Sequence, residues 1–235
     1  CPFLSMASNR LPDSLDRLFA LADRMVSALG HSETAIGLKQ TTAAVLGPIL
    51  EAARMAEAAY GAAQVRDKEA VAAQGIADRA GHDFIANARR RLSMFFGEAY
   101  ATEWSAAGWP NGSTRVPDSQ VERFSLVESL RLYLVENPAH ESADLGVTAV
   151  IAGSVHEAIS DSRAARREAK TNRLRAKQVR DQAVRHLRRR MSGLIQELAT
   201  LLEPDDPRWL AFGLRSPGDP PSSPSPEPDP TGSDR

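Results

Sequence analysis

The chain has 235 residues, a formal net charge of −1, a hydrophobic fraction of 42% and an aromatic fraction of 6%. No apolar run approaches the roughly 18 residues that cross a bilayer, which excludes a membrane-spanning segment. The single cysteine excludes an internal disulfide framework and argues against a cysteine-based zinc site. Long Ala-rich stretches, without alternating β-branched and aromatic residues, predict an all-α fold.

Residues 1–10 are interpreted as an N-terminal extension, and their sequence CPFLSMASNR leaves the origin of Cys1 open. If Met6 is the natural start, MASNRLPDSLDRL leads directly into a helix cap, and a cytoplasmic location is expected. The alternative is a lipidated Cys1 that remains after signal cleavage, which implies export as a lipoprotein.

The same short motifs occur twice and in the same order. This order predicts an internal two-fold repeat, with repeat 1 at 11–108 and repeat 2 at 116–213, packed together as one domain. The matched motifs are LPDS at 11–14 with VPDS at 116–119, FAL at 19–21 with FSL at 124–126, His31 and IGL at 36–38 with His140 and LGV at 145–147, RRRLS at 89–93 with RRRMS at 188–192, and WSAAG at 104–108 with WLAFG at 209–213.

Each repeat is predicted to contain a first helix, a long second helix and a short closing helix. Pro-Asp-Ser is typical of a helix start, since Asp and Ser are good N-caps. The first helix is expected to end near Leu29-Gly30 in repeat 1 and near Asn137-Pro138 in repeat 2. The Trp-x-Ala-x-Gly motifs favour short helices that end in a glycine cap. We interpret Trp104 and Trp209 as structural caps on the end of a bundle and not as ligand-stacking residues.

The long second helices carry small and apolar residues at the alternating four- and three-residue spacing of coiled coils. Residues 147–202 are expected to form one helix, whereas Gly47-Pro48 is expected to kink or restart the helix of repeat 1. Charged residues are expected to avoid the seam. The predicted fold is an antiparallel helical bundle with long Ala-rich coiled-coil helices. In repeat 2 the predicted seam comprises Ile151, Val155, Ala158, Ser162, Ala165, Ala169, Asn172, Ala176, Val179 and Ala183.

Residues 214–235 are predicted to be a disordered tail. Seven prolines fall within the last 20 residues, in SPGDPPSSPSPEPDPTGSDR. Such a composition cannot bury itself and is typical of a semi-extended linker.

Four segments, SNRLPDSLDRLFALADRM, AIGLKQ, RRMSGLIQEL and DDPRWLAFGLRSPGDP, resemble an uncharacterised family of helical bacterial proteins. The resemblance extends over about residues 7–220. In that family a Pro-rich linker tends to connect the helical part to a fibronectin type III-like domain, and no activity is carried over. The sequence departs from this pattern by stopping at Arg235, so either the downstream domain is missing or this member acts alone.

Motifs for nucleotide binding, serine hydrolysis and zinc-dependent hydrolysis were sought and are absent from the sequence. The five histidines are scattered, and His31 and His140 are expected to act in capping near a helix–helix turn. His82 and Asp83, like His156 and Glu157, are neighbours that point about 100° apart on a helix, so neither pair is expected to share a site. We therefore predict no catalytic residue, no metal site and no cofactor.

One stretch has an unusual charge. Residues 163–190 hold 12 Lys or Arg against two acidic residues, Glu168 and Asp181. Such a helix could neutralise phosphates, but no aromatic residue between Tyr133 and Trp209 offers a stacking platform for single strands. A solvated or internally paired basic face is the other interpretation, since 118–144 is acidic. The candidate anion contacts are Arg166, Arg167, Lys170, Arg173, Arg175, Lys177 and Arg180.

These observations predict a non-enzymatic helical scaffold or protein–protein interaction module, with the tail as a tether. A protein partner or self-association is expected. The alternative is a nucleic-acid-associated protein that binds through the basic helix at 163–190.

Overall fold

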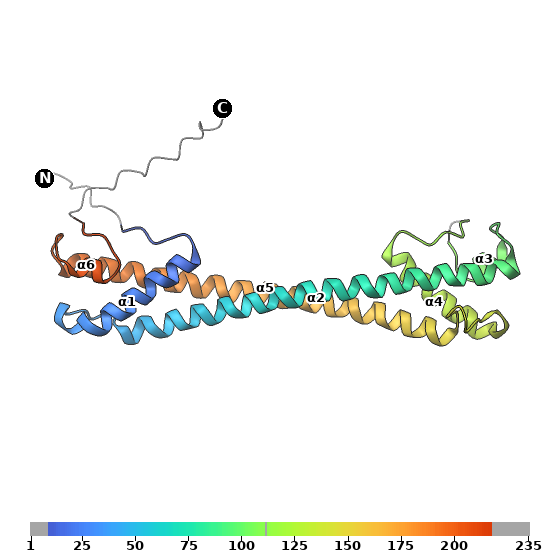
Figure 1. Cartoon of the computed structure of the whole chain (residues 1–235), viewed down its shortest axis with the longest axis horizontal. Coiled ribbons are helices and arrows are strands. Elements are labelled where there is room, and N and C mark those ends of the chain that lie inside the picture. The colour runs from blue at the N-terminus through green and yellow to red at the C-terminus, as the bar shows by residue number, and fades with distance from the viewer. Residues whose placement is uncertain (1–8, 111, 218–235) are drawn as a thin grey trace, which may run out of the picture. The chain divides into compact units, whose positions relative to one another are not determined.

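The computed structural model describes residues 9–110 and 112–217 (Figure 1). Most of the predicted N-terminal extension, and the predicted tail from 218 onward, lie outside the described residues. Within them the chain forms α-helices, one short 3-10 helix (η1) and no β-strand, so the predicted all-α class is confirmed. The helices are α1 (Leu15–Ile36), α2 (Ala43–Phe96), α3 (Thr102–Ala106), α4 (Gln120–Glu136), η1 (Pro138–His140), α5 (Ala149–Leu201) and α6 (Arg208–Ala211).

The chain divides into two compact units. Unit 1 consists of the described parts of Cys1–Ala59 and Gln178–Arg235, and unit 2 of Tyr60–Lys177. Helices α2 and α5 each contribute one part to each unit. Each unit therefore combines residues from the two predicted repeats, and the ranges 11–108 and 116–213 stay a prediction.

Unit 1 has a core made mainly of Leu and Met side chains. One face of α1 packs against the first turns of α2, the last turns of α5 and the short helix α6. Apolar residues three and four apart place these side chains on one face of each helix. The central members are Leu18, Met25 and Leu29 from α1, Leu46 and Leu50 from α2, Leu187, Met191, Leu194 and Leu198 from α5, and Trp209 and Phe212 at α6.

Unit 2 has a separate and more aromatic core. Here α4 packs with the end of α2, the start of α5 and the short helix α3. The rings of Phe96 and Trp104 meet edge to face with centroids 5.3 Å apart, and those of Trp104 and Trp109 at 4.9 Å. The central members are Phe84, Ile85, Ala88 and Leu92 from α2, Trp104 from α3, Trp109 from the loop after α3, Leu126, Leu130 and Leu134 from α4, and Ala152 from α5.

The two Trp-x-Ala-x-Gly motifs form the short helices α3 and α6. Trp104 and Trp209 are buried, and each indole Nε1 donates to a backbone carbonyl, that of Gly97 at 3.2 Å and that of Glu203 at 3.0 Å respectively. Gly108 and Gly213 follow with φ of 101° and 72°, the left-handed region that favours glycine at a helix end.

The predicted end of the first helix is right for α4 and wrong for α1. α4 ends at Glu136, directly before Asn137-Pro138. α1 does not stop near Leu29-Gly30 but continues to Ile36, where Gly37 caps it with φ 82°. A glycine inside a helix costs only about 1 kcal/mol, and burial of Leu29 favours helix in this turn.

Pro48 neither ends nor restarts α2, because the helix includes it. α2 begins at Ala43, so Pro48 lies in the second turn and the loss of its N–H affects only the bond to the Ala44 carbonyl. α5 spans 53 residues, Ala149–Leu201, close to the predicted 147–202.

The predicted seam of α5 is displaced by one residue at every second position. Ile151, Ala158, Ala165, Asn172 and Val179 are exposed. In the same steps of seven, Ala152 and Ile159 are buried, Arg173 and Arg180 are half-buried, and Arg166 is exposed but donates to Gln74 of α2. The expectation that charged residues avoid the seam is therefore wrong. Alanine gains little from burial, so the large Ile159, the buried Val184 and the ion pairs of the arginines fix the rotation of the helix.

Candidate functional site

Two of the predicted anion contacts are paired with carboxylates of α2. In unit 2, Arg173 Nε lies 2.9 Å from Asp67 Oδ2. In unit 1, Arg180 Nη1 lies 3.3 Å from Glu57 Oε2, and its Nε lies 2.7 Å from Asp181 Oδ1. These two charges are compensated within the chain, so Arg173 and Arg180 are poor candidates for phosphate binding.

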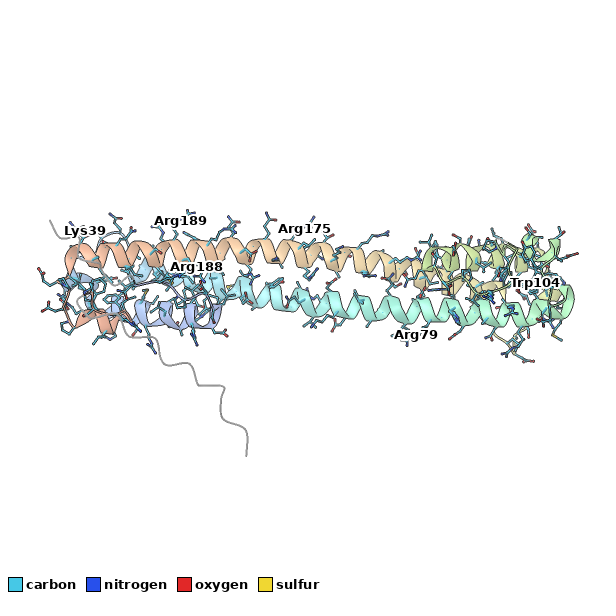
Figure 2. All side chains as sticks on the ribbon, turned by 90° about the horizontal axis from the view of Figure 1, so that it is seen from above. Lys39, Arg79, Trp104, Arg175, Arg188 and Arg189 are labelled. Carbon is cyan, nitrogen blue, oxygen red and sulfur yellow. The ribbon has the colours of Figure 1, made fainter. Side chains whose placement is uncertain are left out.

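Four of the other predicted contacts are exposed on α5 in unit 2. The side chains of Arg167, Lys170, Arg175 and Lys177 have no ion-pair or hydrogen-bond partner within the part of the chain that the structure describes. Arg175 projects away from the ribbon of α5 (Figure 2). These cations are free to meet an external anion.

Arg166 and its neighbour Arg163 are held by neutral groups. Arg166 Nη1 donates to the side-chain oxygen of Gln74 at 2.7 Å. Arg163 Nη2 donates to the backbone carbonyl of Gln120 at 2.6 Å, and its guanidinium lies over the Phe124 ring, 4.7 Å from the centroid. Both guanidinium groups are fixed in position while their charges remain uncompensated. Arg163 was not among the anion contacts predicted from the sequence.

A pocket of about 410 Å³ lies beside this group of cations. It is formed by three helices of unit 2, and no carboxylate is among its lining residues. Its residues are Gln74 from α2, Gln120 and Val121 from α4, and Arg163, Arg166, Arg167 and Lys170 from α5.

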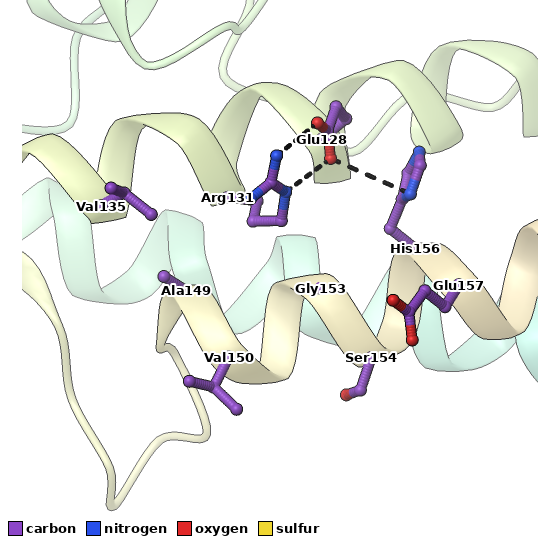
Figure 3. A pocket seen from close by; sticks show the side chains of 9 residues that line it. All are labelled: Glu128, Arg131, Val135, Ala149, Val150, Gly153, Ser154, His156 and Glu157. Atoms are coloured by element: carbon purple, nitrogen blue, oxygen red, sulfur yellow. Dashed lines mark hydrogen bonds and ion pairs between the residues drawn. The ribbon is translucent and has the colours of Figure 1, made fainter.

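A second pocket of unit 2, about 660 Å³, lies between α4 and the first turns of α5 (Figure 3). Arg131 donates two hydrogen bonds to Glu128, at 2.8 and 2.7 Å, and these lower the pKa of the Glu128 carboxyl. His156 Nδ1 lies 3.9 Å from the same carboxylate. The other end of the pocket is apolar and includes Val135 and Val150, the latter 82% exposed.

Unit 2 also contains a buried ion pair that the sequence analysis missed. Arg123 Nε and Nη2 donate to the two oxygens of Asp78 at 3.2 and 2.5 Å. Arg123 Nη1 donates to the carbonyls of Pro117 and Asp118 at 2.7 and 2.8 Å. The available signal was an arginine at the fourth position after the predicted helix cap Ser119, where the corresponding position after Ser14 is Leu18.

The histidines are separate from one another. His31 lies inside α1 and its Nδ1 is 2.8 Å from the Ser27 carbonyl, while His140 Nδ1 is 2.7 Å from the Tyr133 hydroxyl. His82 and Asp83 do meet, with Nδ1 and Oδ1 3.2 Å apart on the exposed surface, so the expectation for that pair is wrong. Side-chain torsions bring the two groups together although their Cβ atoms diverge. Among the residues that the structure describes, no group of three or more His, Cys, Asp or Glu side chains could hold a metal ion.

Comparisons with protein-family models, with curated proteins and with solved structures find no match to this chain. The resemblance to the helical bacterial family therefore stays a prediction. Within 9–110 and 112–217, none of the helices has the length and apolar character that a membrane crossing requires.

Proposed function

We propose that the protein is a non-enzymatic helical scaffold that binds a protein partner through the groove between α4 and α5 in unit 2. The observation that supports this is the large apolar exposure at one end of the groove, where Val135 is 61% and Val150 is 82% exposed. Large exposed apolar side chains that line a groove are typical of interaction sites.

The charges of the groove indicate the chemistry of the partner. Glu128 is compensated by Arg131, whereas the carboxylate of Glu157 is exposed at the same pocket. A complementary partner presents an apolar side chain to Val135 and Val150 and a Lys or Arg to Glu157. An amphipathic helix with a basic flank has this pattern.

The experiment is an affinity pull-down with nuclease-treated and untreated extracts. The double variant Val135→Glu/Val150→Glu introduces charge into the groove. The control Val71→Glu/Ile76→Glu changes two exposed apolar residues of α2 in the same unit. We expect a nuclease-resistant partner that the control retains and the groove variant loses. A partner retained equally by both variants contradicts the proposal.

We also propose that the chain is an internal two-fold repeat built from an antiparallel coiled-coil bundle. Several equivalent hydrogen bonds support this. Glu33 Oε2 accepts from Ala43 N and Glu141 Oε1 from Ala149 N, both at 2.7 Å, at the starts of α2 and α5. The Trp109 and Leu214 amides donate to the carbonyls of Trp104 and Trp209, both at 3.0 Å.

Nucleic-acid binding through 163–190 is the second candidate function. The unpaired Arg167, Lys170, Arg175 and Lys177 favour it, while the ion pairs of Arg173 and Arg180 reduce the available charge. A duplex whose mobility is unchanged by the protein at about 50 mM salt, where phosphate contacts are strong, argues against this function.

A further inference from the structure

One pocket of unit 2 concentrates positive charge at a single place. Arg163, Arg166, Arg167 and Lys170 line it together with two glutamine side chains. Steps of three and four residues place these cations on neighbouring faces of two helical turns. Gln74 on α2 and Gln120 on α4 supply the facing walls, so three helices define the site.

Neutral partners hold the pocket in position. Gln74 is only 8% exposed and makes two contacts, accepting from Arg166 Nη1 at 2.7 Å and donating Nε2 to Gln120 Oε1 at 3.2 Å. The Gln120 carbonyl accepts from Arg163 at 2.6 Å. Ordering two arginine side chains in advance reduces the entropy that a ligand must overcome when it binds.

The carboxylates around the pocket do not compensate its charge. Asp78, also on α2, binds Arg123 through both of its oxygens. Asp67 binds Arg173, one turn beyond Lys170. Glu122 and Glu168 are exposed and are not among the residues that line the pocket. The four cations therefore face a common space without an opposing charge.

We propose that this pocket binds a phosphate-bearing anion with several negative charges. Guanidinium groups match phosphate oxygens in bidentate geometry, and Lys170 adds a mobile ammonium group. The volume of about 410 Å³ accommodates a chain of two or three phosphates. A free polyphosphate and the backbone of a nucleic acid offer this same chemistry. The inference does not rest on the α4–α5 groove.

The test uses the full chain and two double variants. Arg167→Gln/Lys170→Gln removes two pocket charges whose side chains make no hydrogen bond or ion pair with the residues that the structure describes. Arg175→Gln/Lys177→Gln removes two exposed charges of the same helix outside the pocket. Inorganic tripolyphosphate is titrated by calorimetry at about 50 mM salt, where screening is limited. Equal melting temperatures of the three proteins establish that the fold is retained.

We expect the affinity for tripolyphosphate to fall about tenfold or more in the pocket variant, because its missing cations would lie in contact with the phosphates. In the control the affinity should fall by less than about twofold, because salt screens charges that lie farther from the bound anion. Absence of binding to the parent chain, or equal loss in both variants, overturns the proposal.

A duplex of about 20 base pairs distinguishes the two sources. If the pocket variant loses more affinity for the duplex than the control variant does, the ligand is the nucleic-acid backbone. If the duplex does not bind the parent chain while tripolyphosphate binding depends on the pocket, the ligand is a free polyphosphate and the second candidate function fails by itself. If duplex binding is weakened equally in both variants, the nucleic acid contacts the basic helix as a whole and is not the specific ligand of the pocket.

Discussion

The two units place different chemistry at matching positions of similar helices. Leu18 in α1 and Arg123 in α4 both donate their backbone N–H to the carbonyl of the serine four residues earlier, each at 3.0 Å. Leu18 is fully buried among apolar side chains. Arg123 is also buried but binds Asp78 and two backbone carbonyls. Unit 1 thus uses apolar contact where unit 2 uses an ion pair.

The connections between helices show a second difference, with opposite charge. In unit 1, Glu197 of α5 accepts hydrogen bonds from the N–H groups of Lys39, Gln40 and Thr41, at 2.8, 3.0 and 3.2 Å. In unit 2, Arg91 of α2 donates to the carbonyls of Ala139 and His140, at 3.3 and 3.1 Å. Each long helix fixes the loop that leads into the other, through an anion in one unit and a cation in the other.

The comparison indicates that a similar local geometry is compatible with several chemical solutions. A buried leucine gains stability from transfer out of water and tolerates changes of partner. A buried ion pair depends on both members, because the loss of one leaves an uncompensated charge. Unit 2 is therefore expected to be the more sensitive to single polar substitutions.

The largest effects are expected for the two buried tryptophans. Trp104→Ala and Trp209→Ala should each lower the free energy of unfolding by about 3–5 kcal/mol. The Trp104 variant also loses two edge-to-face ring contacts, each worth about 0.5–1.5 kcal/mol, so it should be the more destabilised. Urea unfolding measures both, with Ala169→Ser and Asn172→Ala as controls. A loss of this size should lower the melting temperature by considerably more than about 2 °C. If both Trp variants melt within about 2 °C of the parent, the motif has no structural role.

The next largest effect is expected for the Arg123–Asp78 ion pair of unit 2. It is compared with a change at Leu18, the apolar residue at the matching position in unit 1. Arg123→Leu leaves Asp78 without its cation and should cost about 3 kcal/mol. Asp78→Ala combined with Arg123→Leu removes both charges and should recover about half of that loss or more. Leu18→Met, a conservative change in unit 1, should cost less than about 1.5 kcal/mol. An Arg123→Leu protein as stable as the parent shows that the pair contributes nothing.

Helix type, the extent of α5 and the short helices of the Trp motifs could be predicted from the sequence, because each follows from local spacing. The Ala stripe predicted a packed seam along α5 but not the rotation of the helix about its axis, since adjacent small residues gain similar energies on burial. The displacement toward Arg166 and Arg173 depends on Gln74 and Asp67, about a hundred residues away in the chain. Pair contacts of this kind leave no periodic signal in a single sequence.

The candidate pocket shows the same limit. Arg163, Arg166, Arg167 and Lys170 all lie in the basic stretch at 163–190, whereas nothing in the sequence pointed to the two glutamines. Gln74 and Gln120 carry no charge and belong to different helices, and only the fold brings them to the arginines. Net charge along the sequence likewise could not separate paired cations such as Arg173 from free ones.

A smaller effect is expected at the glycines that end α3 and α6. Both have positive φ, but an added Cβ at Gly108 lies 2.3 Å from the Ser129 Cβ, whereas at Gly213 the nearest atom is the Arg24 Cδ at 3.0 Å. The flexible arginine can move, and the serine Cβ is fixed to the α4 backbone. Gly108→Ala should cost about 2 kcal/mol and Gly213→Ala about 1 kcal/mol. Urea unfolding of the two variants checks this, and the reverse order contradicts the explanation.

The smallest effect concerns the loop that Glu197 fixes, and it depends on pH. Burial raises the pKa of the Glu197 carboxyl, but the three backbone N–H bonds outweigh burial and the net pKa is lowered below its ordinary 4.5. A carboxyl whose pKa is lowered in the folded state stabilises the fold fully at a pH above its pKa in the unfolded chain. This contribution is lost as the pH falls through its pKa in the folded chain. Glu197→Gln should therefore cost about 1 kcal/mol at pH 7 and progressively less below about pH 4.5.

Hydrogen exchange of the Lys39, Gln40 and Thr41 amides provides a local measurement of this contact. In the parent chain their protection should decline as the pH falls below about 4.5, after correction for intrinsic exchange rates, whereas Glu197→Gln should show low protection throughout. Arg91→Gln is the matched control, because its loop contacts involve carbonyls and no carboxylate. Its effect on residues 139–140 should not change over this pH range. If protection of the three amides is the same in the parent and in Glu197→Gln at pH 7, the carboxylate does not hold the loop. The loop of unit 1 is then not fixed by an anion, and the contrast with Arg91 in unit 2 is wrong.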